Sequence, residues 1–164
     1  TPEEISEIIL HVTFYAGWPT GVQASVMAAG GFEERGLSIG PLSRAPAAAQ
    51  RPPAPASATG AYAAVPRLGE LRNSVLYGDV WERPQLSKRD RSLITVAVLQ
   101  AMYRTSELRT HIGRALDQNG VTPQEVSEVI LHVTFYAGWP AAVNAGRLAA
   151  EAFEERGVEL SELE

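Results

Sequence analysis

Apolar residues recur along much of the chain at the spacing of an amphipathic helix. The clearest case lies between residues 123 and 139, where apolar positions follow one another at i, i+3, i+4, i+7 and i+11. This row, which we expect to face a core, contains Val126, Val129, Ile130, Val133 and Ala137. Alternating apolar and polar runs with the length of a strand are missing from the sequence. The pattern therefore predicts an all-α fold, a helical bundle.

Start and stop signals place the other helices. Thr122, followed three residues later by Glu125, is a full N-terminal signal, and Ser87 with Asp90 is a weaker variant of it. Gly120 is expected to end the preceding helix in the left-handed conformation. The remaining helices are predicted over residues 68–81, 87–103, 106–119 and 140–156.

Two of these helices carry more apolar surface than one small bundle can bury. Residues 93–103 have almost no polar face, so this helix needs cover on every side. The helix that starts after Thr122 has a second row opposite its core-facing one: Glu128, His132, Phe135 and Trp139. Aromatic side chains on such a face indicate a subunit interface, a pocket, or both. We expect a homo-oligomer and keep the pocket as the alternative.

A long internal repeat links the two ends of the sequence. Residues 1–36 match residues 122–157 at a constant offset of 121, with 25 of 36 positions identical. Because so much sequence separates the copies, the repeat indicates duplication of a domain whose first copy lacks its front part. The first copy keeps the second row, which we expect to serve the same packing role, as Glu7, His11, Phe14 and Trp18.

The segment between the copies is rich in proline. Residues 37–66 hold six of the eleven prolines, among Ala, Ser and Gly. Such a composition buries too little apolar surface to offset the entropy of ordering, so it predicts a linker. The sequence thus divides into a partial repeat at 1–36, a linker at 37–66 and a complete domain at 67–164. Since the chain begins at Thr1, inside a helix cap, we expect it to belong to a longer or processed polypeptide.

Charge and cysteine content exclude several classes of partner and chemistry. With 14 basic and 19 acidic residues, the formal net charge of −5 leaves no basic surplus for nucleic acid or anionic membrane. The absence of cysteine removes disulfides, thiolate metal sites and thiol redox chemistry. No apolar run reaches the roughly 20 residues that a spanning helix needs. We expect a cytoplasmic protein, and the Ala-, Pro- and Arg-rich linker is typical of a high-GC bacterial source.

Three segments resemble the gamma-carboxymuconolactone decarboxylase family. They are GDVWERPQLSKRDRSLITVAVLQAM, ELRTHIGRAL and GVTPQEVSEVILHVTFYAGWPAAVNA. The resemblance implies an all-helical domain that assembles into trimers or hexamers, with pockets between subunits and neither organic cofactor nor metal. The same family includes peroxidases similar to alkyl hydroperoxide reductase D, which use two cysteines three residues apart and a histidine. If His111 matches that histidine, the cysteine positions fall on Arg104 and Glu107, so a peroxidase is not expected.

Decarboxylation of a carboxymuconolactone needs groups that hold carboxylates, stabilise a dienolate-like anion and deliver a proton to carbon. Arginine suits the first task, and Arg91 and Arg104 are the candidates. Glu107 and His111 are four residues apart and share a helix face, where the carboxylate is expected to orient the imidazole and favour its protonated form. His111 is then the proton donor. A solvated i, i+4 pair and a solvated helix start are the alternatives that remain open.

Four further side chains are candidates for substrate contact, with helix packing as the alternative: His132, Tyr136, Trp139 and Trp81. The three histidines show no spacing of metal ligands, so no metal site is expected. The preferred hypothesis is a cofactor-independent decarboxylase, a carbon-carbon lyase acting on an acidic unsaturated lactone or related small molecule. A cyclase or isomerase of secondary metabolism on the same fold is one alternative. A non-catalytic assembly module is the other.

Overall fold

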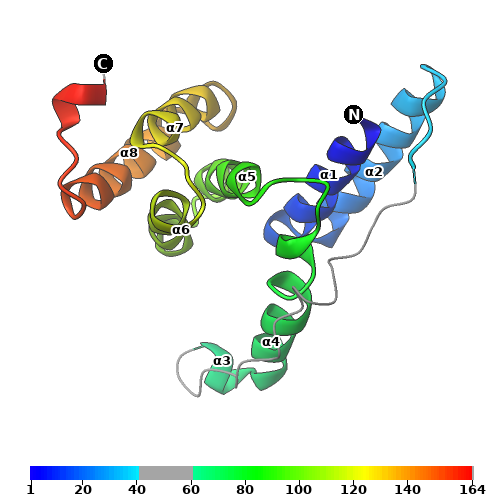
Figure 1. The fold of residues 1–164 in the computed structure, drawn as a ribbon, viewed down its shortest axis with the longest axis horizontal. Helices are drawn as coiled ribbons and strands as arrows, with labels where there is room; N and C mark the ends of the chain where they lie inside the picture. Colours follow the sequence, from blue (N-terminus) through cyan, green and yellow to red (C-terminus); the bar gives the residue numbers. More distant parts are fainter. Residues whose placement is uncertain (41–60, 164) are drawn as a thin grey trace. The chain divides into compact units, whose positions relative to one another are not determined.

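The computed structural model describes residues 1–40 and 61–163. All regular elements in these ranges are helical and none is a strand, which confirms the all-α prediction. The chain forms two compact units, Thr1–Ser87 and Lys88–Glu164, whose elements are coloured along the sequence in Figure 1.

Unit 1 begins with a helical hairpin. Helix α1 (Pro2–Ala16) and helix α2 (Trp18–Glu33) pack side by side, joined by Gly17 alone, whose φ of 95° favours glycine (Figure 1). Thr1 caps α1 in a full capping box with Glu4. The two helices lie close together at Gly21, where a Cβ would meet the side chain of Thr13.

The rest of unit 1 is a chain of short helical segments. They are α3 (Ala61–Ala64), α4 (Pro66–Leu71), the π-helical turn η2 (Arg72–Leu76) and the 3₁₀ turn η3 (Val80–Glu82). The prediction of one continuous helix over 68–81 is therefore wrong. The chain turns at Gly78, where a Cβ would lie 2.6 Å from the carbonyl oxygen of Asn73, and η3 then carries Trp81 into a buried position. The sequence pattern missed this because the apolar spacing continues through the turn.

Unit 2 is a bundle of four longer helices. They are α5 (Lys88–Ala101), α6 (Thr105–Gln118), α7 (Pro123–Ala137) and α8 (Trp139–Glu154), followed by the turn η4 (Leu160–Leu163). Helix α5 packs on α6 and α7, and α8 packs on the same two helices. The capping box of Thr122 and Glu125 forms as predicted, and Gly120 adopts a φ of 69° after α6.

The core of unit 2 follows the predicted faces. On α7 the side chains of Val126, Ile130 and Val133 are buried, which confirms the core-facing row. The prediction that residues 93–103 are covered on every side holds only in part. Thr95, Val96, Leu99 and Gln100 are buried and Leu93, Ile94, Ala97 and Val98 are half-buried, whereas Ala101 and Tyr103 are exposed. The amide Nδ2 of Asn119 donates to Oγ of Ser92 at 2.8 Å, which ties the end of α6 to the start of α5.

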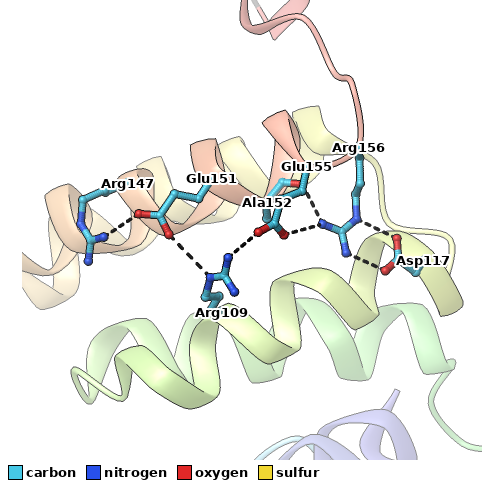
Figure 2. Close-up of polar contacts among 7 residues, drawn as sticks. All are labelled: Arg109, Asp117, Arg147, Glu151, Ala152, Glu155 and Arg156. Atoms are coloured by element: carbon cyan, nitrogen blue, oxygen red, sulfur yellow. Dashed lines mark hydrogen bonds and ion pairs between the residues drawn. The ribbon is translucent and has the colours of Figure 1, made fainter.

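A surface network of ion pairs joins α6 to α8 (Figure 2). Its six charged members alternate in sign along the two helices: Arg147, Glu151, Arg109, Glu155, Arg156 and Asp117. The pair between Arg156 and Asp117 is bidentate, at 2.7 and 2.6 Å, and this hydrogen bonding holds the pKa of Asp117 below its usual value. Exposed pairs of this kind each stabilise by only about 0–1 kcal/mol, so the network orients the two helices more than it stabilises them.

Two of the domain predictions lie partly outside the described residues. Most of the expected linker, namely 41–60 of 37–66, is not described. The complete domain expected to start at 67 stays a prediction, and residues 67–87 group with the N-terminal hairpin in unit 1. Within the described ranges, every helix is too short or too polar to cross a membrane.

Candidate active site

A buried ion pair ties α1 to the turn that ends unit 1. Nε of Arg83 donates to both carboxylate oxygens of Glu7, at 2.9 and 3.0 Å. The side chain of Glu7 is 0% exposed and that of Arg83 is 9% exposed. Asp79 adds a second carboxylate, 4.0 Å from Nη1 of Arg83. Removing one partner from such a pair costs about 3–5 kcal/mol, because the other charge stays buried.

Aromatic rings make further contacts between α1 and the same turn. Nε1 of Trp81 donates to the hydroxyl of Tyr15 at 2.9 Å. The buried ring of His11 contacts both, with its centroid 5.2 Å from that of Tyr15 and 5.1 Å from that of Trp81, in an edge-on arrangement at 73° to Trp81. The ring centroid of Tyr77 lies 5.8 Å from that of Trp81. Unit 1 thus encloses a carboxylate, an imidazole, a guanidinium and three aromatic rings in one cluster.

The helical repeat explains why these residues meet. Glu7, His11 and Tyr15 follow one another at four-residue steps, so they form one face of α1, which we call the α1 row. Residues 80–83, which we call the anchor turn, supply the facing side chains. Phe14 and Trp18 were expected to share the face of Glu7 and His11, and that prediction is wrong. They are 40% and 71% exposed. Each four-residue step turns the row by about 40° around the helix, so the α1 row drifts away from Phe14. Trp18 lies beyond Gly17, in the first turn of α2.

Members of the α1 row and Arg83 were not among the predicted site residues. The repeat carries the signal that finds them. At the offset of 121, His11 and Tyr15 are the first-copy equivalents of His132 and Tyr136, which were predicted to contact substrate together with Trp81. The structure brings Trp81 together with the first-copy pair.

The four predicted catalytic residues lie in unit 2 and differ in burial. Arg91 on α5 is 0% exposed and His111 on α6 is 8% exposed. Arg104 precedes α6 as its N-cap residue and Glu107 lies in its first turn, and both are exposed. Among the described residues Glu107 forms no hydrogen bond or ion pair, so the expected pair with His111 is not made.

Burial decides the protonation state of His111. Desolvation, with a smaller effect from the charge of Arg114, lowers the pKa of His111 from an ordinary 6.5 to about 4. The prediction that its protonated form is favoured is therefore wrong. At neutral pH the ring is an uncharged imidazole with one donor and one acceptor nitrogen.

The predicted substrate-contact residues of unit 2 lie on its surface. His132 and Tyr136 point outward from α7 with their ring centroids 5.1 Å apart, and Tyr136 is 81% exposed. Trp139, 74% exposed, borders an apolar groove of 380 Å³ between α7 and α8, together with Phe135 and Val143. Exposed aromatic residues beside an apolar groove are typical of a surface that binds another molecule.

Comparison with known proteins shows a family match and two similar proteins. Residues 66–152, just over half of the sequence, match the sequence model of the carboxymuconolactone decarboxylase family. The chain belongs to this family. Over 82 residues it is 49% identical to a 4-carboxymuconolactone decarboxylase of Acinetobacter baylyi, covering 50% of this chain and 60% of that protein. It is also 37% identical over 76 residues to a nitrosuccinic acid decarboxylase of Metarhizium robertsii, covering 46% of this chain and 52% of that one. The chain thus spans little more than half the length of these relatives.

The family match includes the residues predicted from the sequence and leaves out the α1 row. All eight residues predicted from the sequence lie inside 66–152, and so does the anchor turn. The α1 row lies outside the match, in the additional copy of the hairpin. In this member of the family, the N-terminal hairpin therefore contacts a turn that lies within the family match. The described residues contain no group of three His, Cys, Asp or Glu side chains that could hold a metal ion.

Proposed function

We propose that the chain is part of a cofactor-independent decarboxylase that acts on a small acidic molecule. One observation carries the proposal: α5 and α6, which pack on each other, bury a guanidinium and an imidazole, Arg91 and His111, within the family segment. Both relatives are named as decarboxylases of small acids, which supports the same class of substrate here. An unsaturated lactone that carries a carboxylate is the first substrate to test.

The proposed reaction needs a group that holds a carboxylate and a group that delivers a proton to carbon. Arg91 holds a carboxylate of the substrate through charge-assisted hydrogen bonds. The bond between the departing carboxylate and its carbon breaks, CO₂ leaves, and the electron pair passes to the conjugated acceptor of the substrate. The resulting anion then takes a proton at carbon. Arg104, exposed ahead of α6, is the second candidate for holding an acidic group during this sequence.

His111 gains its proton from the binding event in this scheme. An imidazole with a pKa of about 4 is neutral at pH 7, so it holds no proton to give in the empty site. A bound anion nearby raises the pKa of an imidazole, because opposite charges stabilise its protonated form. We therefore propose that an acidic substrate brings about proton uptake by His111, which then protonates the carbon after CO₂ has left. Glu107, without a partner in the described residues, is free to face the same anion or the solvent.

Release of CO₂ from 4-carboxymuconolactone and from nitrosuccinate tests the proposal. His111→Gln should lower kcat by about 10²- to 10⁴-fold, whereas Thr110→Ala, at the exposed neighbour on α6, should leave it unchanged. Turnover to an isomer without loss of CO₂ would favour the cyclase or isomerase alternative. A folded protein that turns over neither compound would support the assembly module instead.

A second pair of variants tests the carboxylate-binding role. Arg91→Lys keeps the charge and loses the bidentate geometry, so KM should rise by about 10-fold or more. Arg89→Lys on the same helix is the matched control, because Arg89 is paired with Glu125 at the surface. Equal effects of the two substitutions would contradict the proposal for Arg91.

We further propose that the protein acts as a homo-oligomer in the cytoplasm. The apolar groove between α7 and α8 and the exposed rings beside it support self-association. Light scattering should give a mass above the 17.7 kDa of one chain. A stable monomer at micromolar concentration would contradict this proposal.

A further inference from the structure

The chain carries the same three-residue row twice. Glu128, His132 and Tyr136 on α7, which we call the α7 row, are the second-copy equivalents of the α1 row at the offset of 121. Helices α1 and α7 have the same length and the same capping box, and 12 of their 15 residues are identical. Whatever the α1 row recognises, the α7 row is therefore chemically equipped to recognise.

The two rows also share their local geometry. In the α1 row the histidine and tyrosine rings are 5.2 Å apart and inclined at 44°. In the α7 row they are 5.1 Å apart and inclined at 42°. The two rings of the α7 row thus already have the arrangement that the rings of the docked α1 row have, so docking needs no change in their relative geometry.

Their surroundings differ completely. Glu7 and His11 are 0% exposed, whereas Glu128 and His132 are exposed and Tyr136 is 81% exposed. Among the described residues Glu128 makes no hydrogen bond or ion pair. The α7 row is thus a surface whose complement, the anchor turn with Trp81 and Arg83, occurs elsewhere in the same sequence.

We propose that the α7 row docks on the anchor turn of a second copy of this chain when the α1 row leaves that turn, and that it then takes the place of the α1 row. Charge and shape both favour this occupant. The guanidinium of Arg83 meets a carboxylate at the start of the row, and the indole N–H of Trp81 meets a phenol hydroxyl at its end. The second copy would contribute a carboxylate, an imidazole and a phenol to the cluster, which is incomplete without one of the two rows.

The stoichiometry makes the two rows competitors. Within the described residues each chain has two such rows and one anchor turn. The α1 row, tethered to the turn in the same chain, has the advantage of a high effective concentration. The N-terminal hairpin therefore acts as a cap that prevents the anchor turn from binding the α7 row of another molecule.

Charge reversal in the full chain tests the competition. Glu7→Arg places two guanidinium groups together and should displace the α1 row. Sedimentation velocity from low to high micromolar concentration should then show a mass at least twice that of the wild-type assembly. Adding Glu128→Arg should abolish this gain, because the α7 row then repels Arg83 as well. Both variants disturb α1 equally, so the difference between them reports the α7 row alone.

A compensating variant completes the test. Glu7→Arg combined with Arg83→Glu restores opposite charges within the chain and should return the mass to the wild-type value. The proposal is overturned if Glu7→Arg leaves the mass unchanged, or if the added Glu128→Arg does not remove the gain. Failure of the compensating variant would also overturn it, since non-specific aggregation through a loosened α1 would explain that result.

Discussion

The two copies of the hairpin have nearly the same sequence and bury different faces. In the first copy the α1 row is enclosed by the anchor turn, while α2 buries only Gly21. In the second copy the α7 row is exposed, while α8 buries six residues against the bundle. Identical side chains at Glu7 and Glu128 thus have opposite environments. The comparison teaches that the neighbours of this hairpin, more than its own pattern, decide which of its two faces becomes a core.

Sequence differences between the copies follow the same division. Most of the non-identical positions lie in the second helix of each hairpin. Arg147 and Glu151, which belong to the network that joins α8 to α6, correspond to Val26 and Gly30 in α2. Val26 is 65% exposed. The first copy thus lacks two of the four second-copy charges in this network, although Glu34 and Arg35 are the equivalents of Glu155 and Arg156. It keeps the row that attaches it to the anchor turn.

The largest difference should come from the same substitution made in each copy. Glu7→Ala leaves Arg83 buried beside fewer carboxylates and should lower the free energy of unfolding of unit 1 by about 3 kcal/mol or more. Glu128→Ala changes an exposed side chain and should stay within about 0.5 kcal/mol. Urea unfolding followed by tryptophan fluorescence, at sub-micromolar protein to limit association, measures both. Equal effects of the two substitutions would show that the burial of the α1 row adds nothing to stability.

A second test uses the pH dependence of stability that comes from His111. This residue lies on α6, the helix that packs on α8 of the second copy. The pKa of His111 is about 4 in the folded protein against an ordinary 6.5. Below pH 6.5 the unfolded state binds more protons, so stability falls as the pH drops from 6.5 to 4 and levels off below that. The full loss amounts to about 3 kcal/mol. His111→Gln should remove this part of the pH dependence. Unfolding by guanidinium chloride at pH 7, 5.5 and 4 would then show a smaller loss of stability in the variant than in the wild type. An unchanged loss would mean that His111 is protonated in the folded state.

Exchanging one small residue between the copies should have an intermediate effect. Gly21→Ala introduces a Cβ that would meet Thr13, so the close approach of α1 and α2 must widen, at a cost of about 1–3 kcal/mol. The second copy already has alanine at the equivalent position, Ala142, and Ala142→Gly should cost about 1 kcal/mol through helix propensity. Thermal unfolding by circular dichroism compares the two. A stabilising Gly21→Ala would show that the first hairpin has room to adopt the geometry of the second.

The smallest effect belongs to the surface network. Arg147→Ala removes one exposed ion pair and should cost about 0.2–1 kcal/mol. The reciprocal Val26→Arg in the first copy should have no measurable effect, because Gly30 stands where Glu151 would pair with it. The same denaturation experiment at low and high salt checks this, since the contribution of Arg147 should shrink as salt screens the pair.

Helices and their ends were largely predictable from local signals. The core-facing row of α7, the capping box at Thr122 and the turn at Gly120 all depend on nearby residues, and each was confirmed. The break at Gly78 was not predicted, because it depends on a close approach between Gly78 and a carbonyl five residues earlier, which leaves no mark on apolar spacing.

The site was less predictable, because it depends on contacts across long sequence separations. Burial lowered the pKa of His111, although its spacing from Glu107 suggested the opposite. Contact between Arg83 and Glu7 spans 76 residues, and no periodicity reports such a pair. The repeat was the available signal, since it transfers the predicted role of His132 to His11, but only the structure identified which copy meets Trp81.

The order of the two rows along the chain also gives the first row priority during synthesis. When Arg83 is added to the growing chain, the α1 row has already been made, whereas Glu128 is still 45 residues from being added. At ordinary rates of translation this interval lasts roughly 2 to 9 s. Helical hairpins form in far less time than this. A nascent chain can therefore close its own anchor turn before it possesses an α7 row.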